Sequence, residues 1–167
     1  MKYTVFLSHS SKDMNLVTSV RKKLEKAGIN VYLAEKDPQP GKRLPEKIIS
    51  NVHAANCMVV LLTDMGIRSQ FVNQEIGAAT AYNKPIIPMV EKKMKNKVKG
   101  LLEGRELIIF DKHKLDQAIS RVSSYISDIK LSIELKMEER EELLKFLAVV
   151  AFIVLIALLL YFASRRK

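Results

Sequence analysis

The sequence predicts an α/β fold in which a five-stranded parallel sheet carries helices on both faces, followed by one C-terminal transmembrane helix. Three observations point to it. Strand-like and helix-like segments alternate over about the first 126 of the 167 residues. The strand-like runs are apolar almost throughout, which is typical of a parallel sheet covered on both faces. The chain then ends in a dense, uncharged apolar block.

Each expected strand is a short run rich in β-branched and apolar residues. The five strands are expected at residues 3–8, 29–34, 57–63, 85–90 and 105–110. The segments between them place apolar residues three or four positions apart, as helices do. These helices are expected at residues 13–27, from Pro45 to about residue 52, at 69–82 and at 115–126. Because strands and helices alternate, right-handed crossovers should join consecutive strands.

The apolar block comprises residues 146–163 and contains no charged residue, glycine or proline. As a helix it would be about 27 Å long, close to the roughly 30 Å hydrocarbon core of a bilayer. Tyr161 lies near its end, where an amphipathic ring suits the membrane interface, and a basic tail follows. The alternative is a helix buried in a protein core, but the block is apolar on every face.

We therefore expect four parts: a soluble domain at residues 1–127, a charged helical stalk at 128–145, a transmembrane helix at 146–163 and a basic tail at 164–167. The soluble domain should face the cytoplasm and the C-terminus should lie outside, because translocating the larger part would need a signal that the sequence does not show. The single cysteine, Cys57, suits a reducing compartment and should be a buried apolar side chain.

The chain has a formal net charge of +10, and part of this charge is local. Five lysines fall within eight residues: Lys92, Lys93, Lys95, Lys97 and Lys99. This segment is either a solvated loop or a surface attracted to anionic lipid headgroups. Nucleic-acid binding is not expected, because no recognisable motif accompanies the charge and tryptophan is absent. No spacing of cysteine and histidine indicates a metal site.

Polar segments follow the first three expected strands. They are residues 8–13, 35–43 and 63–75. In an open parallel sheet ligands bind outside the carboxyl ends of the strands, so these segments should meet at one edge. Together the stretches FLSHSSKD, PGKRLPEKI and SQFVNQEIG, in this order and spacing, resemble a Toll/interleukin-1 receptor (TIR) domain of the prokaryotic type. The resemblance covers about residues 1–126 and implies the flavodoxin-like TIR fold.

The resemblance also implies an activity. Many TIR domains cleave NAD+ between nicotinamide and ribose, some of them forming cyclic products. Their catalytic glutamate lies on the helix after the third strand, four residues beyond an aromatic residue. Here that pattern falls on Phe71 and Glu75, with phenylalanine where the family usually has tryptophan. NAD+ would be a substrate, so no cofactor is expected. The implied role is that of a membrane-anchored NAD+ nucleosidase in prokaryotic immune, antiviral or cell-death signalling.

One carboxylate suffices for this chemistry because nicotinamide is already a cationic leaving group and needs no general acid. A fixed carboxylate beside the ribose would stabilise the oxocarbenium character of the transition state, as in glycosidases. Phe71 lies one turn before Glu75 on the same helix face. The alternatives are a solvated surface carboxylate for Glu75 and core packing for Phe71.

Four further residues are candidate substrate contacts, each with a structural alternative: Ser8, Ser10, Arg43 and Asp37. Arg43 could bind the pyrophosphate or be a solvated loop residue. The two serines could bind ligand or act as turn and N-cap hydroxyls. Asp37 is either a ribose contact or a loop residue. His9 is expected to be a turn residue, and His53 and His113 receive no role.

Two other functions compete. Some TIR domains are non-catalytic adaptors that act by homotypic TIR–TIR assembly, although these often lack the glutamate. The loop at residues 35–44 corresponds to the family's BB loop, which mediates such contacts. A receiver-like regulator is disfavoured, since the paired acids after the first strand and the phospho-accepting aspartate after the third are missing. The pair Thr63-Asp64 is the nearest approach.

Overall fold

The fold is described from a computed structural model. It describes residues 3–33, 44–98, 102 and 104–165, with residues 44–48, 160, 162 and 163 described by their backbone only. The chain divides into two compact units, residues 1–125 and residues 126–167. Each unit is considered by itself below.

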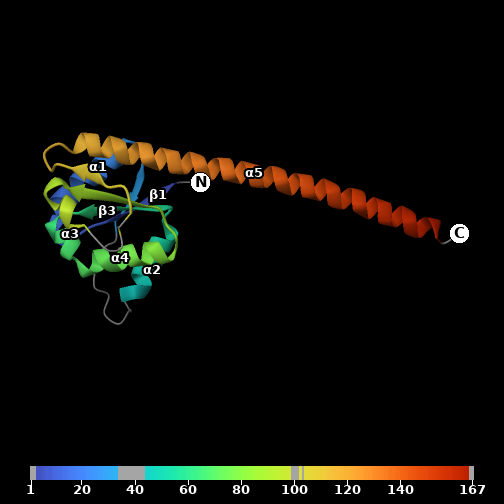
Figure 1. Cartoon of the computed structure of the whole chain (residues 1–167), viewed down its shortest axis with the longest axis horizontal. Coiled ribbons are helices and arrows are strands. Elements are labelled where there is room, and N and C mark those ends of the chain that lie inside the picture. Colours follow the sequence, from blue (N-terminus) through green and yellow to red (C-terminus); the bar gives the residue numbers. More distant parts are fainter. Residues whose placement is uncertain (1–2, 34–43, 99–101, 103, 166–167) are drawn as a thin grey trace. The chain divides into compact units, whose positions relative to one another are not determined.

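The first unit is built on a five-stranded sheet (Figure 1). The strands are β1 (Thr4–Ser8), β2 (Asn30–Tyr32), β3 (Cys57–Leu62), β4 (Ile86–Glu91) and β5 (Ile108–Phe110). Their order is β2-β1-β3-β4-β5, and every neighbouring pair is parallel. This is the flavodoxin-like order, in which a topological switch point lies between β1 and β3. The predicted five-stranded parallel sheet is confirmed, and each predicted strand is present.

Helices cover both faces of this sheet (Figure 1). The longer ones are α1 (Met14–Lys26), α2 (Leu44–Ala54), α4 (Gln70–Ala81) and α5 (Leu115–Ser164). One face carries α1 and the start of α5, which are also joined by an ion pair between Lys23 and Asp116. The other face carries α2 and α4. The α4 helix lies shortly after the carboxyl end of β3, as the candidate site requires.

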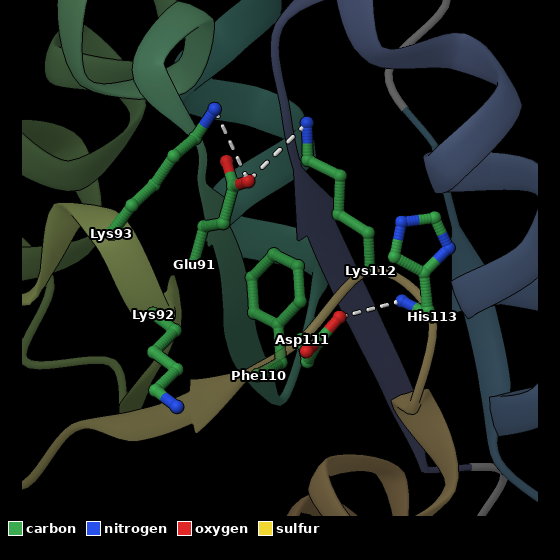
Figure 2. Close-up of a pocket in the computed structure, with 7 residues that line it drawn as sticks. All are labelled: Glu91, Lys92, Lys93, Phe110, Asp111, Lys112 and His113. Carbon is green, nitrogen blue, oxygen red and sulfur yellow. Dashed lines mark hydrogen bonds and ion pairs between the residues drawn. The ribbon is translucent and has the colours of Figure 1, made fainter.

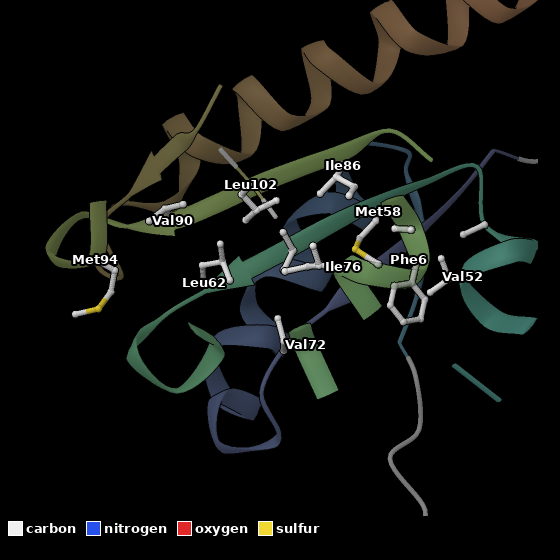
Figure 3. Packing of buried hydrophobic residues seen from close by; sticks show 13 residues of the cluster. Phe6, Val52, Met58, Leu62, Val72, Ile76, Ile86, Val90, Met94 and Leu102 are labelled. Carbon is white, nitrogen blue, oxygen red and sulfur yellow. The ribbon is translucent and has the colours of Figure 1, made fainter. Parts of the chain in front are cut away.

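The core follows from strand alternation, because successive side chains point to opposite faces. Met58, Val60 and Leu62 of β3 are buried together with Val72 and Ile76 of α4. Figure 3 labels Met58, Leu62, Val72 and Ile76 of this cluster, which also contains Phe6 of β1 and Val52 of α2. The intervening residues of β3 are buried as well. The sheet is therefore buried on both sides, which explains its almost continuous apolar strands.

Some short helices in the structure were not predicted. Residues 64–68 form α3 (Asp64–Arg68), where the sequence suggested a loop, and residues 92–97 form the 3-10 helix η2 (Lys92–Lys97) within the lysine-rich segment. Each is too short to show a hydrophobic period. Position 66 in α3 requires glycine, because a Cβ atom there would come within 2.4 Å of the backbone oxygen of Leu61. Glycine is what allows this helix to follow β3 so closely.

The second unit consists of the continuation of α5. This helix is unbroken from Leu115 to Ser164, so the stalk and the apolar block are one helix. Within the described residues, this helix alone is long and apolar enough to cross a membrane, and none of its apolar window is buried. The block is therefore a candidate membrane span.

Candidate active site at the carboxyl edge of the sheet

The centre of the candidate site is a contact between Ser8 and Glu75, which are 67 positions apart in the sequence. Ser8 Oγ donates a hydrogen bond to Glu75 Oε2 at 2.5 Å. Ser8 is the last residue of β1, and Glu75 lies in the middle of α4. Only 1% of Ser8 and 2% of Glu75 is exposed. The topology thus brings together two residues that the sequence singled out separately.

The α4 helix holds Glu75 inward. Ser69 caps this helix, with its side chain accepting a hydrogen bond from the backbone N–H of Val72. Val72, Ile76 and Ala79 follow at helical spacing and are buried against the sheet. Glu75 directly precedes Ile76 and shares its burial. The alternative of a solvated surface carboxylate is therefore wrong, and a buried carboxylate in this position needs polar partners such as Ser8.

The residues after Ser8 are also buried, with local hydrogen bonds. His9 Nδ1 lies 3.0 Å from the carbonyl oxygen of Leu7, so this nitrogen carries the proton in that contact. Ser10 caps the 3-10 helix η1 (Ser11–Asp13), its Oγ accepting a hydrogen bond from the backbone N–H of Lys12. The capping role considered for Ser10 is present. These bonds fix the path of the chain that follows β1.

A second pair of residues, which the sequence analysis missed, links the segment after β1 to α3 by a hydrogen bond. Thr63 Oγ1 donates to Asp13 Oδ2 at 2.6 Å and accepts from the backbone N–H of Gly66 at 2.9 Å. Thr63 is the N-cap of α3. The contact joins the segments after β1 and β3, which are 50 positions apart. No local sequence pattern could have revealed it, because each residue alone is an ordinary turn or capping residue.

The remaining predicted contacts divide into two groups. Phe71 is 42% exposed on α4, so its expected alternative of core packing is wrong. It lies one helical turn before Glu75. Arg43 and Asp37 lie outside the described residues, as does most of the loop at residues 35–44. Their roles stay predictions.

The arrangement can orient a carboxyl group toward a ligand. Ser8 holds the buried side chain of Glu75 at the carboxyl edge of the sheet through a hydrogen bond. Within the described residues, no group of three or more metal-ligating side chains occurs. Cys57, expected to be buried, is 1% exposed, and burial raises the pKa of its thiol to about 11. It is therefore protonated at neutral pH and is not a nucleophile.

A second polar region lies at the same edge, beyond β4 and β5, and was not predicted. A cavity of about 490 Å³ is surrounded by residues from these strand ends. Phe110 and Glu91 are the buried members of this lining. Glu91 Oε1 lies 3.4 Å from the ammonium groups of both Lys93 and Lys112 (Figure 2). Its Oε2 has no hydrogen-bond partner among the described residues. His113, given no role, also lines this cavity.

Comparison with known proteins supports the resemblance. A family model described as TIR domain matches residues 5–122. The TIR domain of the Toll-related receptor TRR-2 from Hydra magnipapillata is similar in structure, with a TM-score of 0.59, 20% identity, and coverage of 75% of this chain and 97% of that chain. The CMP N-glycosidase BcmB of Clostridium botulinum has a TM-score of 0.55 and 18% identity, covering 71% of this chain and 98% of that chain.

A heterodimer of the RPS4 and RRS1 TIR domains is also similar, with a TM-score of 0.52 and 13% identity over 76% of this chain and 97% of that chain. At these identities the structural matches show the fold. No curated protein matches the sequence.

Proposed function

Because this chain belongs to the TIR domain family, we propose that it is an NAD+ nucleosidase that cleaves the bond between nicotinamide and ribose. The observation that carries the proposal is the burial of Glu75 in contact with Ser8 at the carboxyl edge of the sheet. The similar fold of a protein described as a CMP N-glycosidase supports it, since that protein is named for cleavage of an N-glycosidic bond.

Glu75 would act by electrostatic stabilisation. As the bond to nicotinamide breaks, positive charge builds on the ribose, and a carboxylate fixed beside the sugar stabilises it. Nicotinamide leaves as a neutral ring and takes the bonding electron pair with it. Water then attacks the ribose and loses a proton to the solvent to give ADP-ribose, or an internal nucleophile of the substrate attacks and loses its proton to give a cyclic product. The hydrogen bond from Ser8 Oγ would hold the carboxylate in place before the reaction.

Other residues would position the substrate. We assign the exposed ring of Phe71 to stacking against a ring of NAD+, and Ser10 to a polar contact at the start of the site. Arg43 would bind the pyrophosphate and Asp37 a ribose hydroxyl. NAD+ is the substrate in this proposal, and no resident cofactor or metal takes part.

The proposal places the enzyme at a membrane. The apolar part of α5, residues 146–163, would cross the bilayer, with the TIR domain at residues 1–127 in the cytoplasm, where NAD+ is present, and the C-terminus outside. Self-association would follow through the TIR domains, as in the similar TIR heterodimer. Confinement to a membrane raises the effective concentration for this step. The biological setting we propose is prokaryotic immune or cell-death signalling.

Lipid is the second proposed partner. Four lysines of the lysine-rich segment are exposed in the structure: Lys92, Lys93, Lys95 and Lys97. Lys99 lies outside the described residues. Exposed ammonium groups attract anionic headgroups, by about 1 kcal/mol for each residue that comes close to the membrane surface. Lys93 also pairs with Glu91, so the segment has a structural role as well.

The alternative function is that of a non-catalytic adaptor, and the similar TIR heterodimer favours it. The discriminating experiment compares three forms of the full chain in liposomes, with nicotinamide release from NAD+ measured by chromatography. Glu75→Gln should lower release on the order of 10²-fold, because it removes one preorganised charge. Glu25→Gln is the matched control, since it makes the same change at an exposed carboxylate of α1. It should leave release unchanged.

Equal release by wild type and Glu75→Gln would reject Glu75 as the catalytic residue. A folded wild type that assembles but releases no nicotinamide would support the adaptor. In the Glu75→Gln variant the new amide oxygen could still accept the hydrogen bond from Ser8, so folding should be preserved.

A further inference from the structure

The stalk carries an apolar stripe that remains exposed. Ile133, Met137 and Leu144 are 40%, 60% and 57% exposed on the continuous helix α5. Their spacings of four and seven residues place all three on one helix face. Ile129, half-buried, begins the same face. We call Ile129, Ile133, Met137 and Leu144 the stalk stripe.

Charged side chains lie within and beside the stripe. Lys130, seven positions before Met137, is on the same face and forms an ion pair with Glu134 at 3.9 Å, and Glu141 beside the face forms an ion pair with Lys145 at 3.7 Å. An apolar seam with charged flanks is the pattern of a helix that packs against another helix. These charges also keep the stalk out of the hydrocarbon interior. The partner is therefore expected in the aqueous layer beside the membrane.

The partner that fits is a second copy of this chain. This step rests on the proposed membrane anchor, since two copies with the same span enter the membrane in the same direction. Their stalks must then run parallel. In a parallel pair with Ile133, Met137 and Leu144 at the seam, Lys136 of one copy lies opposite Glu141 of the other, five positions on. Charge complementarity and orientation thus agree with pairing of identical helices.

We propose that two copies of this chain pair through a parallel helical contact along the stalk stripe. Arg140, between Met137 and Leu144, and Lys130, seven positions before Met137, lie on the same face. Charged residues in a seam lower the stability of the pair while restricting its register. The contact is therefore reversible. Beyond it, the small side chain of Ala151 continues the face into the span, where small residues allow helices to approach closely.

Cysteine scanning of the full chain in membranes tests the contact. The background is Cys57→Ala, and single cysteines replace each residue from 128 to 145 before oxidation and non-reducing gel electrophoresis. Disulfide-linked dimer should peak at the positions of one face, which are 130, 133, 137, 140 and 144. Leu131→Cys and Leu135→Cys are matched controls, because these residues are equally apolar and 56% and 52% exposed on the opposite face. The peaks should exceed these controls by about threefold or more, since a packed seam brings only one face together.

A flat profile across the stalk, or peaks at 131 and 135, would overturn the proposal. A charge exchange separates stalk pairing from association driven by the TIR domains. Lys136→Glu should lower cross-linking at position 137, and adding Glu141→Lys should restore it, because the two changes recreate the pair across the seam. No loss with the single change, or no recovery with the double change, would also overturn it.

Discussion

Two buried glutamates lie at the same edge of the sheet, and their surroundings differ. Glu75 on α4 is 2% exposed and accepts a hydrogen bond from the hydroxyl group of Ser8. Glu91 at the end of β4 is 7% exposed and lies 3.4 Å from two lysine ammonium groups. The two ammonium groups balance the charge of Glu91 and hold its side chain in place, which suits structural support. The proposed chemistry belongs to Glu75, which lies beside the end of β1 on the helix where the family's catalytic glutamate is expected.

The position of the Glu75 carboxylate should matter as much as its charge. Glu75→Asp keeps the charge but withdraws the carboxylate by one methylene group. We predict a loss of nicotinamide release on the order of 10²-fold, since a displacement of about 1 Å can cost that much in a preorganised site. Glu91→Asp is the control and should retain wild-type release. Full activity in Glu75→Asp would show that charge alone suffices and would weaken the role given to the Ser8 contact.

Ser8→Ala should have the next largest effect. It removes the hydroxyl group that donates to the buried Glu75 Oε2. We predict about a tenfold loss in kcat, because the carboxylate becomes less well oriented. Ser10→Ala, which removes a cap hydroxyl without touching that bond, should lower kcat by less. If the two substitutions have equal effects on kcat, Ser8 has no special part in holding Glu75.

Phe71→Ala should act on substrate binding. The ring is 42% exposed, so truncation costs little folding stability, and the loss of one stacking contact should raise KM about fivefold. Steady-state kinetics and a thermal melt of the same protein check both parts. Phe71→Trp, which restores the residue usual in the family, should lower KM. An unchanged KM together with a markedly lower Tm would instead place Phe71 in the structural support of α4.

The smallest effect is expected at the second glutamate. Glu91→Gln removes the charge that holds Lys93 and Lys112 at the ends of β4 and β5. The lysines are largely exposed, so we predict a loss of about 1 kcal/mol in stability and no change in nicotinamide release. Thermal unfolding in detergent, followed by circular dichroism, measures the loss of stability. A strong loss of activity with normal stability would extend the catalytic region to β4 and remove the contrast between the two glutamates.

The sequence predicted the sheet because its five strands are short apolar runs separated by amphipathic helices. It missed α3, since five residues are too few to show a period, and Gly66 is explained only by its approach to Leu61 in space. Glu75 and Phe71 were found through family resemblance, whereas spacing alone left Glu75 as an ordinary surface carboxylate. Its burial depends on packing against the sheet.

Local sequence patterns could not predict the contacts between residues far apart in the chain. The bonds between Ser8 and Glu75 and between Thr63 and Asp13 join residues 67 and 50 positions apart. The order of the strands in the sheet decides which distant residues come into contact. Local sequence patterns do not show which strands pair with each other. Glu91 gave no signal either, because one carboxylate at the end of a strand has no distinctive spacing. The sequence can predict that the polar segments meet at the carboxyl edge of the sheet. Only the structure shows which residues of these segments form hydrogen bonds with each other.

The most direct test of the proposed activity is release of nicotinamide by the wild-type chain. The full chain is placed in liposomes at increasing surface density and given NAD+ labelled in the nicotinamide ring, and free labelled nicotinamide is measured over time. We predict release that depends on the protein and rises per molecule with density, because confinement favours self-association. NAD+ recovered intact at every density, from chains shown to be folded and associated, would contradict an enzymatic role for Glu75.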